Sequence, residues 1–155
     1  MAIHREYWTF NPKWLEYVKN TWVPNLEGDG RVQQIKTETP ESTEFKERAR
    51  QAFEARGVQF KTVKTYLSIQ IPKDGQGYDD GYPHIHYPLD AMTLVHYLQT
   101  GDKPAPLHII NTGTVIEEVI PEQGMTVFMP NNLEHGVLKN GGTQDRIQLI
   151  ATALR

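Results

Sequence analysis

The feature that most constrains the fold of this chain is a series of short strand-like segments, which fills its second part from about Val58 to the end. Each segment is rich in β-branched and aromatic residues, and Gly, Pro, Asn or Asp residues typical of turns separate it from the next. The segments are 58–71, 92–98, 106–110, 114–120, 125–129, 135–139 and 146–154. No helical pattern interrupts them, which favours an antiparallel sandwich or barrel over a βαβ sheet.

The first part of the chain, residues 1–57, carries helix signals instead. Two capping residues are each followed by a proline suited to the first helical position, and apolar residues at helical spacing come after both. These signals are Asn11-Pro12 before Trp14, Leu15 and Val18, and Thr39-Pro40 before Phe45, Ala49, Ala52 and Phe53. We predict helices near 12–20 and 40–56, with a loop and one strand between them, and expect both helices to cover one outer sheet face.

Composition narrows the class of protein. The 155 residues suit a single domain spanning 1–155, with a helical part at 1–57 and a β core at 58–155. Without cysteine, the chain has no disulfide, no thiolate metal site and no cysteine nucleophile. The net charge of −3, with dispersed Lys and Arg, argues against a nucleic-acid partner. No segment is apolar for long enough to cross a membrane, and the N-terminus is unlike a signal peptide, so we expect a cytoplasmic protein.

The candidate chemistry lies in three of the six histidines. His84 and His86 are separated by one residue, and on a strand such residues point to the same face with Cα atoms about 6–7 Å apart. They follow a Gly- and Asp-rich loop, where the mouth of a barrel would lie. His135 follows a turn and begins the next strand, so it can reach the same mouth. We predict that these three residues bind one divalent metal ion and leave open coordination positions.

Other readings of these residues stay open at this point. An isolated His-x-His pair is a weak signal, and packed or surface histidines are the common alternative. Among carboxylates, Asp90 has the strand parity of the pair, although Pro88 interrupts a regular strand. Asp79 and Asp80 in the preceding loop are further candidate ligands. His96 alternates with leucines in an apolar strand, so we interpret it as a packed strand residue.

The ordered pattern resembles the iron(II)/2-oxoglutarate-dependent oxygenases, especially the prolyl-hydroxylase-like branch. That family has a His-x-Asp pair, a strand ending in Tyr-Leu-Asn, a distal His and an Arg on the last strand. Here PHIHYPLDAMTLVHYLQ is similar to the first block, and GMTVFMPNNLEHGVLKNGGTQDRIQLIATAL to the second. The resemblance covers about the last 90 residues. It implies a mostly β, double-stranded β-helix (jelly-roll) fold with the two N-terminal helices packed on one sheet.

The resemblance also implies roles for single residues. His84 and His135 would bind iron(II), and 2-oxoglutarate would be the cosubstrate. Arg146 would pair with the distal carboxylate of 2-oxoglutarate, and Tyr97 would hydrogen-bond to that carboxylate. The substrate would be a small molecule or a protein side chain, and nothing in the sequence indicates the oligomeric state. The chain departs from the family at His86, which stands where the family has an acidic ligand.

Strand parity bears on Arg146 independently of the family. Arg146 and Gln148 share one face of the final strand, so Arg146 points either into the barrel with Gln148 or out into solvent. A guanidinium group inside a confined site is a natural bidentate partner for a carboxylate. The loop GQGYDDGYP before the histidine pair either lines the entrance to the site or is an exposed loop without a role.

Two alternatives to the oxygenase remain. The chain is also similar to the cupins, which share the jelly roll and whose first motif has His-x-His followed by Glu. Asp90 stands at that position here, and Gly124, Pro130 and His135 are similar to the second motif. A cupin-type metalloprotein, a dioxygenase or an isomerase, would need no 2-oxoglutarate. The second alternative is a jelly-roll binding module without catalysis, because fold does not fix function.

Overall fold

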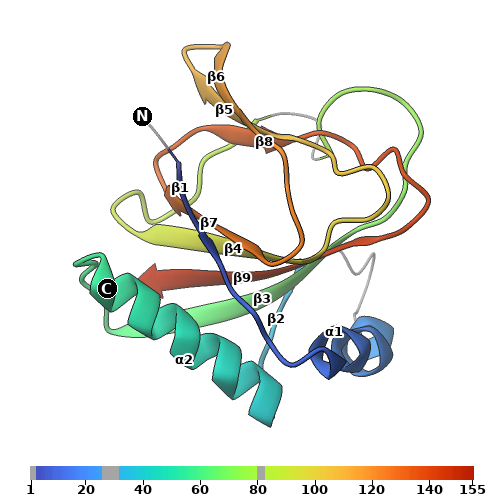
Figure 1. The fold of residues 1–155 in the computed structure, drawn as a ribbon. Coiled ribbons are helices and arrows are strands. Elements are labelled where there is room, and N and C mark those ends of the chain that lie inside the picture. The colour runs from blue at the N-terminus through green and yellow to red at the C-terminus, as the bar shows by residue number, and fades with distance from the viewer. Residues whose placement is uncertain (1–2, 26–31, 80–82) are drawn as a thin grey trace.

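The computed structural model describes residues 3–25, 32–79 and 83–155, which form mainly β structure with helices near the N-terminus (Figure 1). The helices are α1 (Lys13–Tyr17), a π-helix (Val18–Trp22), a 3-10 helix (Val23–Asn25) and α2 (Pro40–Ala55). The strands are β1 (His4–Tyr7), β2 (Val32–Gln34), β3 (Thr62–Gln70), β4 (Met92–Gln99), β5 (Leu107–Asn111), β6 (Thr114–Val119), β7 (Met125–Pro130), β8 (His135–Val137) and β9 (Arg146–Leu154).

The strands form two sheets, and each neighbouring pair is antiparallel. The larger sheet has the order β1-β7-β4-β9-β3-β2, and the smaller has the order β6-β5-β8. Each of the seven strand-like segments predicted in the second part of the chain corresponds to one of the strands β3 to β9. The predicted mostly β, two-sheet antiparallel jelly roll is confirmed.

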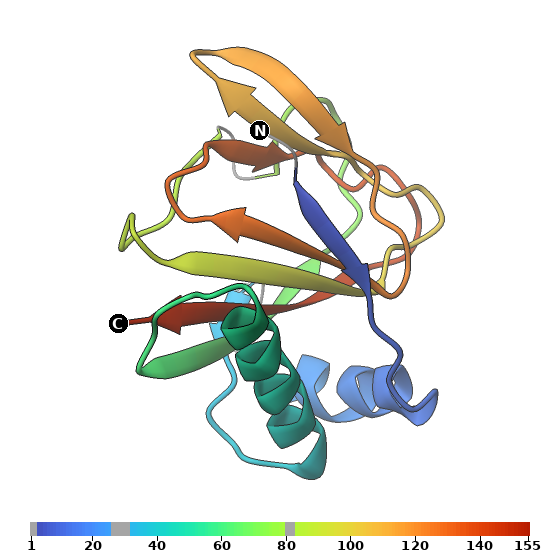
Figure 2. The same cartoon turned by 60° about the vertical axis from the view of Figure 1, so that its left-hand side comes forward.

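Helix α2 shows how the N-terminal part attaches to the larger sheet. Thr39 and Ser42 form a capping box, in which Ser42 N donates to Thr39 Oγ1 at 3.1 Å and Thr39 N donates to Ser42 Oγ at 2.8 Å. The helix buries its apolar stripe, including Phe45 and Phe53, against β3 and β9. Figures 1 and 2 show α2 crossing the outer face of the larger sheet. The prediction that helices cover one sheet is therefore confirmed for α2.

The N-terminal part is not only helical, which differs from the predicted division of the chain. β2 lies within the stretch where one strand was expected. β1 was not predicted, because its four residues are mostly polar and exposed and show no apolar alternation. Both are edge strands of the larger sheet, β1 on β7 and β2 on β3. The predicted helix at 12–20 is α-helical only from Lys13 to Tyr17 and continues as the π-helix.

The larger sheet carries an apolar core on each face. The outer core lies under the helices and includes Trp14, Phe45 and Leu149, whereas the inner core lies between the sheets and includes Val127 and Ile109. The inner core does not fill the whole space between the sheets, and the candidate site occupies the remainder. Among the described residues, no helix is long and apolar enough to cross a membrane.

Candidate metal centre

The structure brings together the three histidines that the sequence singled out. The nitrogen atoms of His84, His86 and His135 that face the cluster all lie within 4.8 Å of one another. His86 Nε2 and His135 Nε2 are 3.1 Å apart. Two nitrogens bound at right angles to one ion, at about 2.1 Å each, lie about 3 Å apart. The donor set therefore fits a metal ion without rearrangement of this pair.

Main-chain hydrogen bonds from separate segments position these side chains. His135 begins β8, and it exchanges two hydrogen bonds with His84, from His84 N to His135 O at 2.8 Å and from His135 N to His84 O at 3.0 Å. His86 N donates to Asn131 O at 2.9 Å. The segment 84–86 is not the regular strand that we expected, because a single β-bridge at His84 is its only ladder pairing among the described residues. The pair nevertheless converges on His135.

His135 is held in the form that binds a metal. Its Nδ1 lies 2.9 Å from Leu133 O, and a carbonyl oxygen only accepts, so Nδ1 carries the proton. Its Nε2 is therefore the acceptor nitrogen, and it lies 3.1 Å from His86 Nε2. Burial is the main cause that lowers the pKa of His135 to about 4, and the neighbouring His84 and His86 lower it further. A neutral imidazole with its second nitrogen fixed by a hydrogen bond is typical of metal ligands.

A cavity of about 160 Å³ extends from the histidines between the two sheets. All three histidines line it, and so do Tyr97 of β4 and Gln148 of β9. Gln148 Nε2 donates to Gln70 Oε1 at 3.2 Å, which fixes the two amides in the cavity wall. The cavity is therefore lined both by the candidate metal ligands and by further polar side chains, among them Tyr97 and Gln148.

Arg146 is fully buried, which excludes the solvent-facing orientation that strand parity left open. Its Nη2 donates to Ala105 O, whereas Nε and Nη1 have no hydrogen-bond partner among the described residues. Its guanidinium carbon lies 5.9 Å from the ring centroid of Tyr97. Burial lowers the pKa of Arg146, and the nearby Tyr97 and Asp79 act in the opposite direction by raising it. A buried cation with two unused donors beside a cavity is poised to bind an anion.

Tyr97 is also buried, and burial raises its pKa to about 12 although Arg146 acts in the opposite direction. The phenol therefore stays protonated at neutral pH and can donate a hydrogen bond. The guanidinium group of Arg146 faces the ring of Tyr97, so the two residues predicted to bind the cosubstrate are neighbours. Their role in binding remains a proposal.

The carboxylates that were weighed as ligands lie elsewhere. Asp90 has a side chain that is 60% exposed and forms an ion pair with Arg155 at 3.3 Å. Asp79 lines the cavity, but its Oδ1 is 2.9 Å from Lys73 Nζ, and it is outside the ligand cluster. Asp80 lies outside the described residues. Within the described part of the chain, the candidate metal centre is thus a set of three histidines.

Sequence reasoning missed the polar residues that support the site. Asn131 is 1% exposed, and its Oδ1 accepts from Thr93 Oγ1 at 2.6 Å while its Nδ2 donates to Pro88 O at 3.0 Å. Asn131 thereby joins β4 to the turn after His86. The available signal was the position of Asn131 between Pro130 and the distal histidine, but an asparagine in a turn ordinarily satisfies its own backbone.

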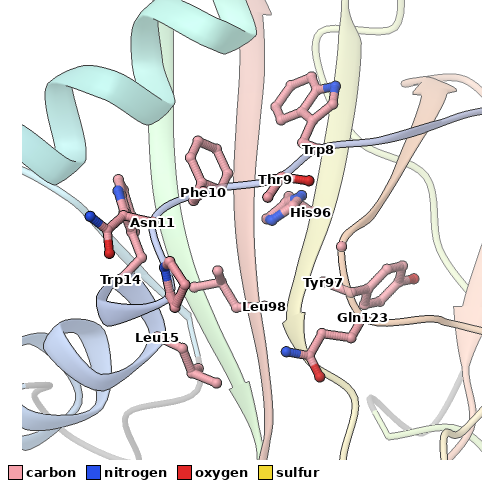
Figure 3. A pocket seen from close by; sticks show the side chains of 12 residues that line it. Trp8, Thr9, Phe10, Asn11, Trp14, Leu15, His96, Tyr97, Leu98 and Gln123 are labelled. Atoms are coloured by element: carbon pink, nitrogen blue, oxygen red, sulfur yellow. The ribbon is translucent and has the colours of Figure 1, made fainter.

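His96 lies on the other side of the larger sheet from the metal centre, as a packed strand residue. It is 1% exposed, its ring stacks on Trp8 at 5.7 Å, and its Nδ1 is 2.8 Å from Thr126 Oγ1. Figure 3 shows it beside Trp8 and Phe10, at a surface pocket of about 450 Å³. This confirms the interpretation of His96 as a packed residue and separates it from the histidine cluster.

The chain folds as a jelly roll that carries a set of three histidines, and solved structures share this fold. A Pseudomonas putida prolyl-4-hydroxylase superposes with a TM-score of 0.71 and 14% identity, covering 99% of this chain and 92% of that chain. A viral collagen prolyl hydroxylase from Paramecium bursaria Chlorella virus-1 superposes with a TM-score of 0.71 and 11% identity, covering 100% of this chain and 90% of that chain. HygX from Streptomyces hygroscopicus, solved with nickel and 2-oxoglutarate bound, superposes with a TM-score of 0.64 and 11% identity. The match covers 98% of this chain and 81% of that chain.

At these identities the likeness establishes the fold. No family model matches the chain. No curated protein matches it either. The chain thus has the fold of the prolyl hydroxylases and related oxygenases, and its activity has to be argued from its own residues.

Proposed function

We propose that this protein is an iron(II)-dependent oxygenase that uses 2-oxoglutarate and O2 to hydroxylate a small-molecule or peptide substrate. One observation carries the proposal. The cavity between the sheets is lined by three convergent histidines, and a fully buried arginine with two unused nitrogen donors lies beside the Tyr97 that also lines it. The two features would provide a site for a metal ion in the cavity and a site for a carboxylate at the part of its wall that Tyr97 forms.

The metal would be held by His84, His86 and His135. Imidazole nitrogens suit iron, and also zinc, nickel and copper. Three protein ligands leave positions for a cosubstrate and for oxygen. Three neutral imidazoles leave the charge of a divalent ion uncompensated, so the site favours an anionic ligand in those open positions.

The cosubstrate would lie between the metal ligands and Arg146. Arg146 is suited to bind the distal carboxylate through its two free nitrogens, and Tyr97 is suited to donate its hydroxyl proton to the same group. The surrounding apolar core excludes water and strengthens this charge pair. When bound, iron(II) and 2-oxoglutarate supply oxidative decarboxylation to succinate and CO2, with one oxygen atom of O2 entering a substrate C–H bond.

The donor set gives specific support to one other function. Three histidines without a carboxylate are similar to the ligand set of some cupin dioxygenases, which do not use 2-oxoglutarate. In such a cupin-type metalloprotein, Arg146 would bind the carboxylate of another substrate. Turnover of 2-oxoglutarate separates the two functions.

The test is oxygen-dependent succinate formation by protein of known metal content. The iron(II)-loaded protein should convert 2-oxoglutarate to succinate slowly even without a substrate, and the metal-free protein should not. His135→Ala is the matched control, because it removes one ligand and leaves Arg146 in place. Iron binding without any 2-oxoglutarate turnover would favour the cupin-type function, and absence of metal binding would favour a non-catalytic binding module.

A further inference from the structure

The outer face of the smaller sheet carries a row of hydrogen-bonded side chains that the proposed function does not use. Tyr78 Oη lies 3.1 Å from His108 Nδ1, and His108 Nε2 lies 2.9 Å from Glu118 Oε2. From this geometry we infer that Tyr78 is a positioning residue of the metal centre, which holds the chain before His84 against the strand that carries His135. The inference rests on the proposed metal site.

The chain before His84 is attached to the free edge of β8. Asp79 N donates to Val137 O at 2.7 Å, and His84 exchanges its two hydrogen bonds with His135 at the other end of the strand. The described residues on either side of 80–82 therefore both rest on β8. Asp79 and His84 thus both pair with the strand that carries His135.

The side chain of Tyr78 stabilises this attachment from the outer face of the smaller sheet. Asp79 lines the cavity, so the side chain of its neighbour Tyr78 projects to the opposite face. There the ring covers Gly136, the residue after the ligand His135. A Cβ atom at Gly136 would lie 2.6 Å and 2.8 Å from Cδ1 and Cε1 of Tyr78. Gly136 has no positive φ, so the absence of its side chain serves the ring contact rather than a turn.

The hydrogen bonds of the row have one direction when His108 is neutral. The carboxylate of Glu118 only accepts, so His108 Nε2–H donates to it, and the remaining Nδ1 of a neutral His108 accepts the Tyr78 hydroxyl proton. His108 pairs directly with Glu118 of β6 and with Gly136 of β8. The row therefore crosses all three strands and ties Tyr78 to the whole sheet rather than to β8 alone.

Tyr78→Phe tests the inference, because it removes only the hydroxyl group that joins the row. We expect the variant to bind Co²⁺ about tenfold more weakly than the wild type, with a changed visible absorption spectrum of the bound ion. The matched control is Tyr7→Phe on β1, which removes a phenol hydroxyl that lies 2.8 Å from Glu122 Oε2, outside the ligand cluster and the cavity. The control should bind Co²⁺ as the wild type does. Thermal unfolding of the metal-free proteins should show similar stability for the two variants.

A double-mutant cycle tests the ring contact independently of the hydroxyl. Gly136→Ala should weaken Co²⁺ binding in the wild type by pushing the ring away, and should have little further effect in a Tyr78→Ala background. Additive effects would overturn the inference, as would wild-type affinity and spectrum in Tyr78→Phe, and both results would leave the proposed metal site intact. Failure of the wild type to bind Co²⁺ would instead overturn the metal site and the inference together.

Discussion

His86 Nε2 and His135 Nε2 lie 3.1 Å apart, although 49 positions separate the two residues in the chain. Main-chain hydrogen bonds to different residues hold the two in place. His86 N donates to Asn131 O, and His135 pairs with His84. His135 Nε2 is an acceptor, so at this distance either a proton on His86 Nε2 or a metal ion can lie between the two nitrogens. The relationship places His86 in the candidate metal centre, at the position where the sequence departs from the His-x-Asp pair of the family that it resembles.

The ligand assignment predicts a ranking of two substitutions. His86→Ala should lower the affinity for a divalent metal ion by about 100-fold or more, because it removes a direct ligand. Asp90→Ala should leave the affinity unchanged, because Asp90 is paired with Arg155 in solvent. His86→Asp should retain metal binding with a carboxylate in place of the imidazole. Metal titration of the three variants checks this, and the reverse ranking would assign the ligand role to Asp90.

The buried arginine predicts a separate effect on the cosubstrate. Removing one partner of a buried charge pair costs roughly 2–5 kcal/mol, so Arg146→Ala should weaken 2-oxoglutarate binding by about two orders of magnitude or more. The bound metal should remain. Arg155→Ala is the control, because its guanidinium group is exposed. Calorimetry on the metal-loaded variants measures both effects, and equal affinities in the two variants would exclude Arg146 from the anion site.

The buried His96 predicts a dependence of stability on pH. Burial lowers its pKa from 6.5 to about 4 in the folded protein, with a smaller contribution from Arg48. The unfolded chain therefore binds more protons between these values, and the stability contributed by neutral His96 is lost as the pH falls from about 6.5 to 4. The loss amounts to about 3 kcal/mol. Urea unfolding should show this slope in the wild type, and a smaller slope in His96→Gln.

The contact of α2 with the larger sheet predicts that a substitution in this contact lowers the stability of the fold and leaves metal binding unchanged. Phe45 is fully buried in the outer core, and its ring centroid lies 6.5 Å from that of Trp8. Phe45→Ala should lower the free energy of unfolding by about 3–5 kcal/mol. Metal affinity, measured where the variant is still folded, should not change. If the folded variant also binds metal more weakly than the wild type, α2 also positions the site.

The positions of the strands along the chain and the grouping of three histidines could be predicted from the sequence, because both depend on local signals. Apolar residues and turn residues mark each strand from β3 to β9, and the His-x-His pair and the histidine after a turn marked the three histidines. Strand parity also restricted Arg146 to two orientations. Burial decided between them, and burial depends on the packing of the whole sheet.

Other features depend on contacts between distant segments and had no local signal. β1 is polar along most of its length, and it is a strand because it pairs with β7. Asp90 has the parity of a ligand, but the chain after His86 turns it toward Arg155. Tyr78 and His108 are 30 positions apart, and neither the loop nor the strand indicates their hydrogen bond.

The central claim is that one cavity binds both a metal ion and 2-oxoglutarate. Anaerobic calorimetric titration of the iron(II)-loaded protein with 2-oxoglutarate tests it most directly, with the metal-free protein and glutarate, which lacks the 2-oxo group, as controls. Saturable binding of one 2-oxoglutarate per metal ion is expected, with much weaker binding in both controls. A protein that holds iron and shows no binding of 2-oxoglutarate would contradict the claim.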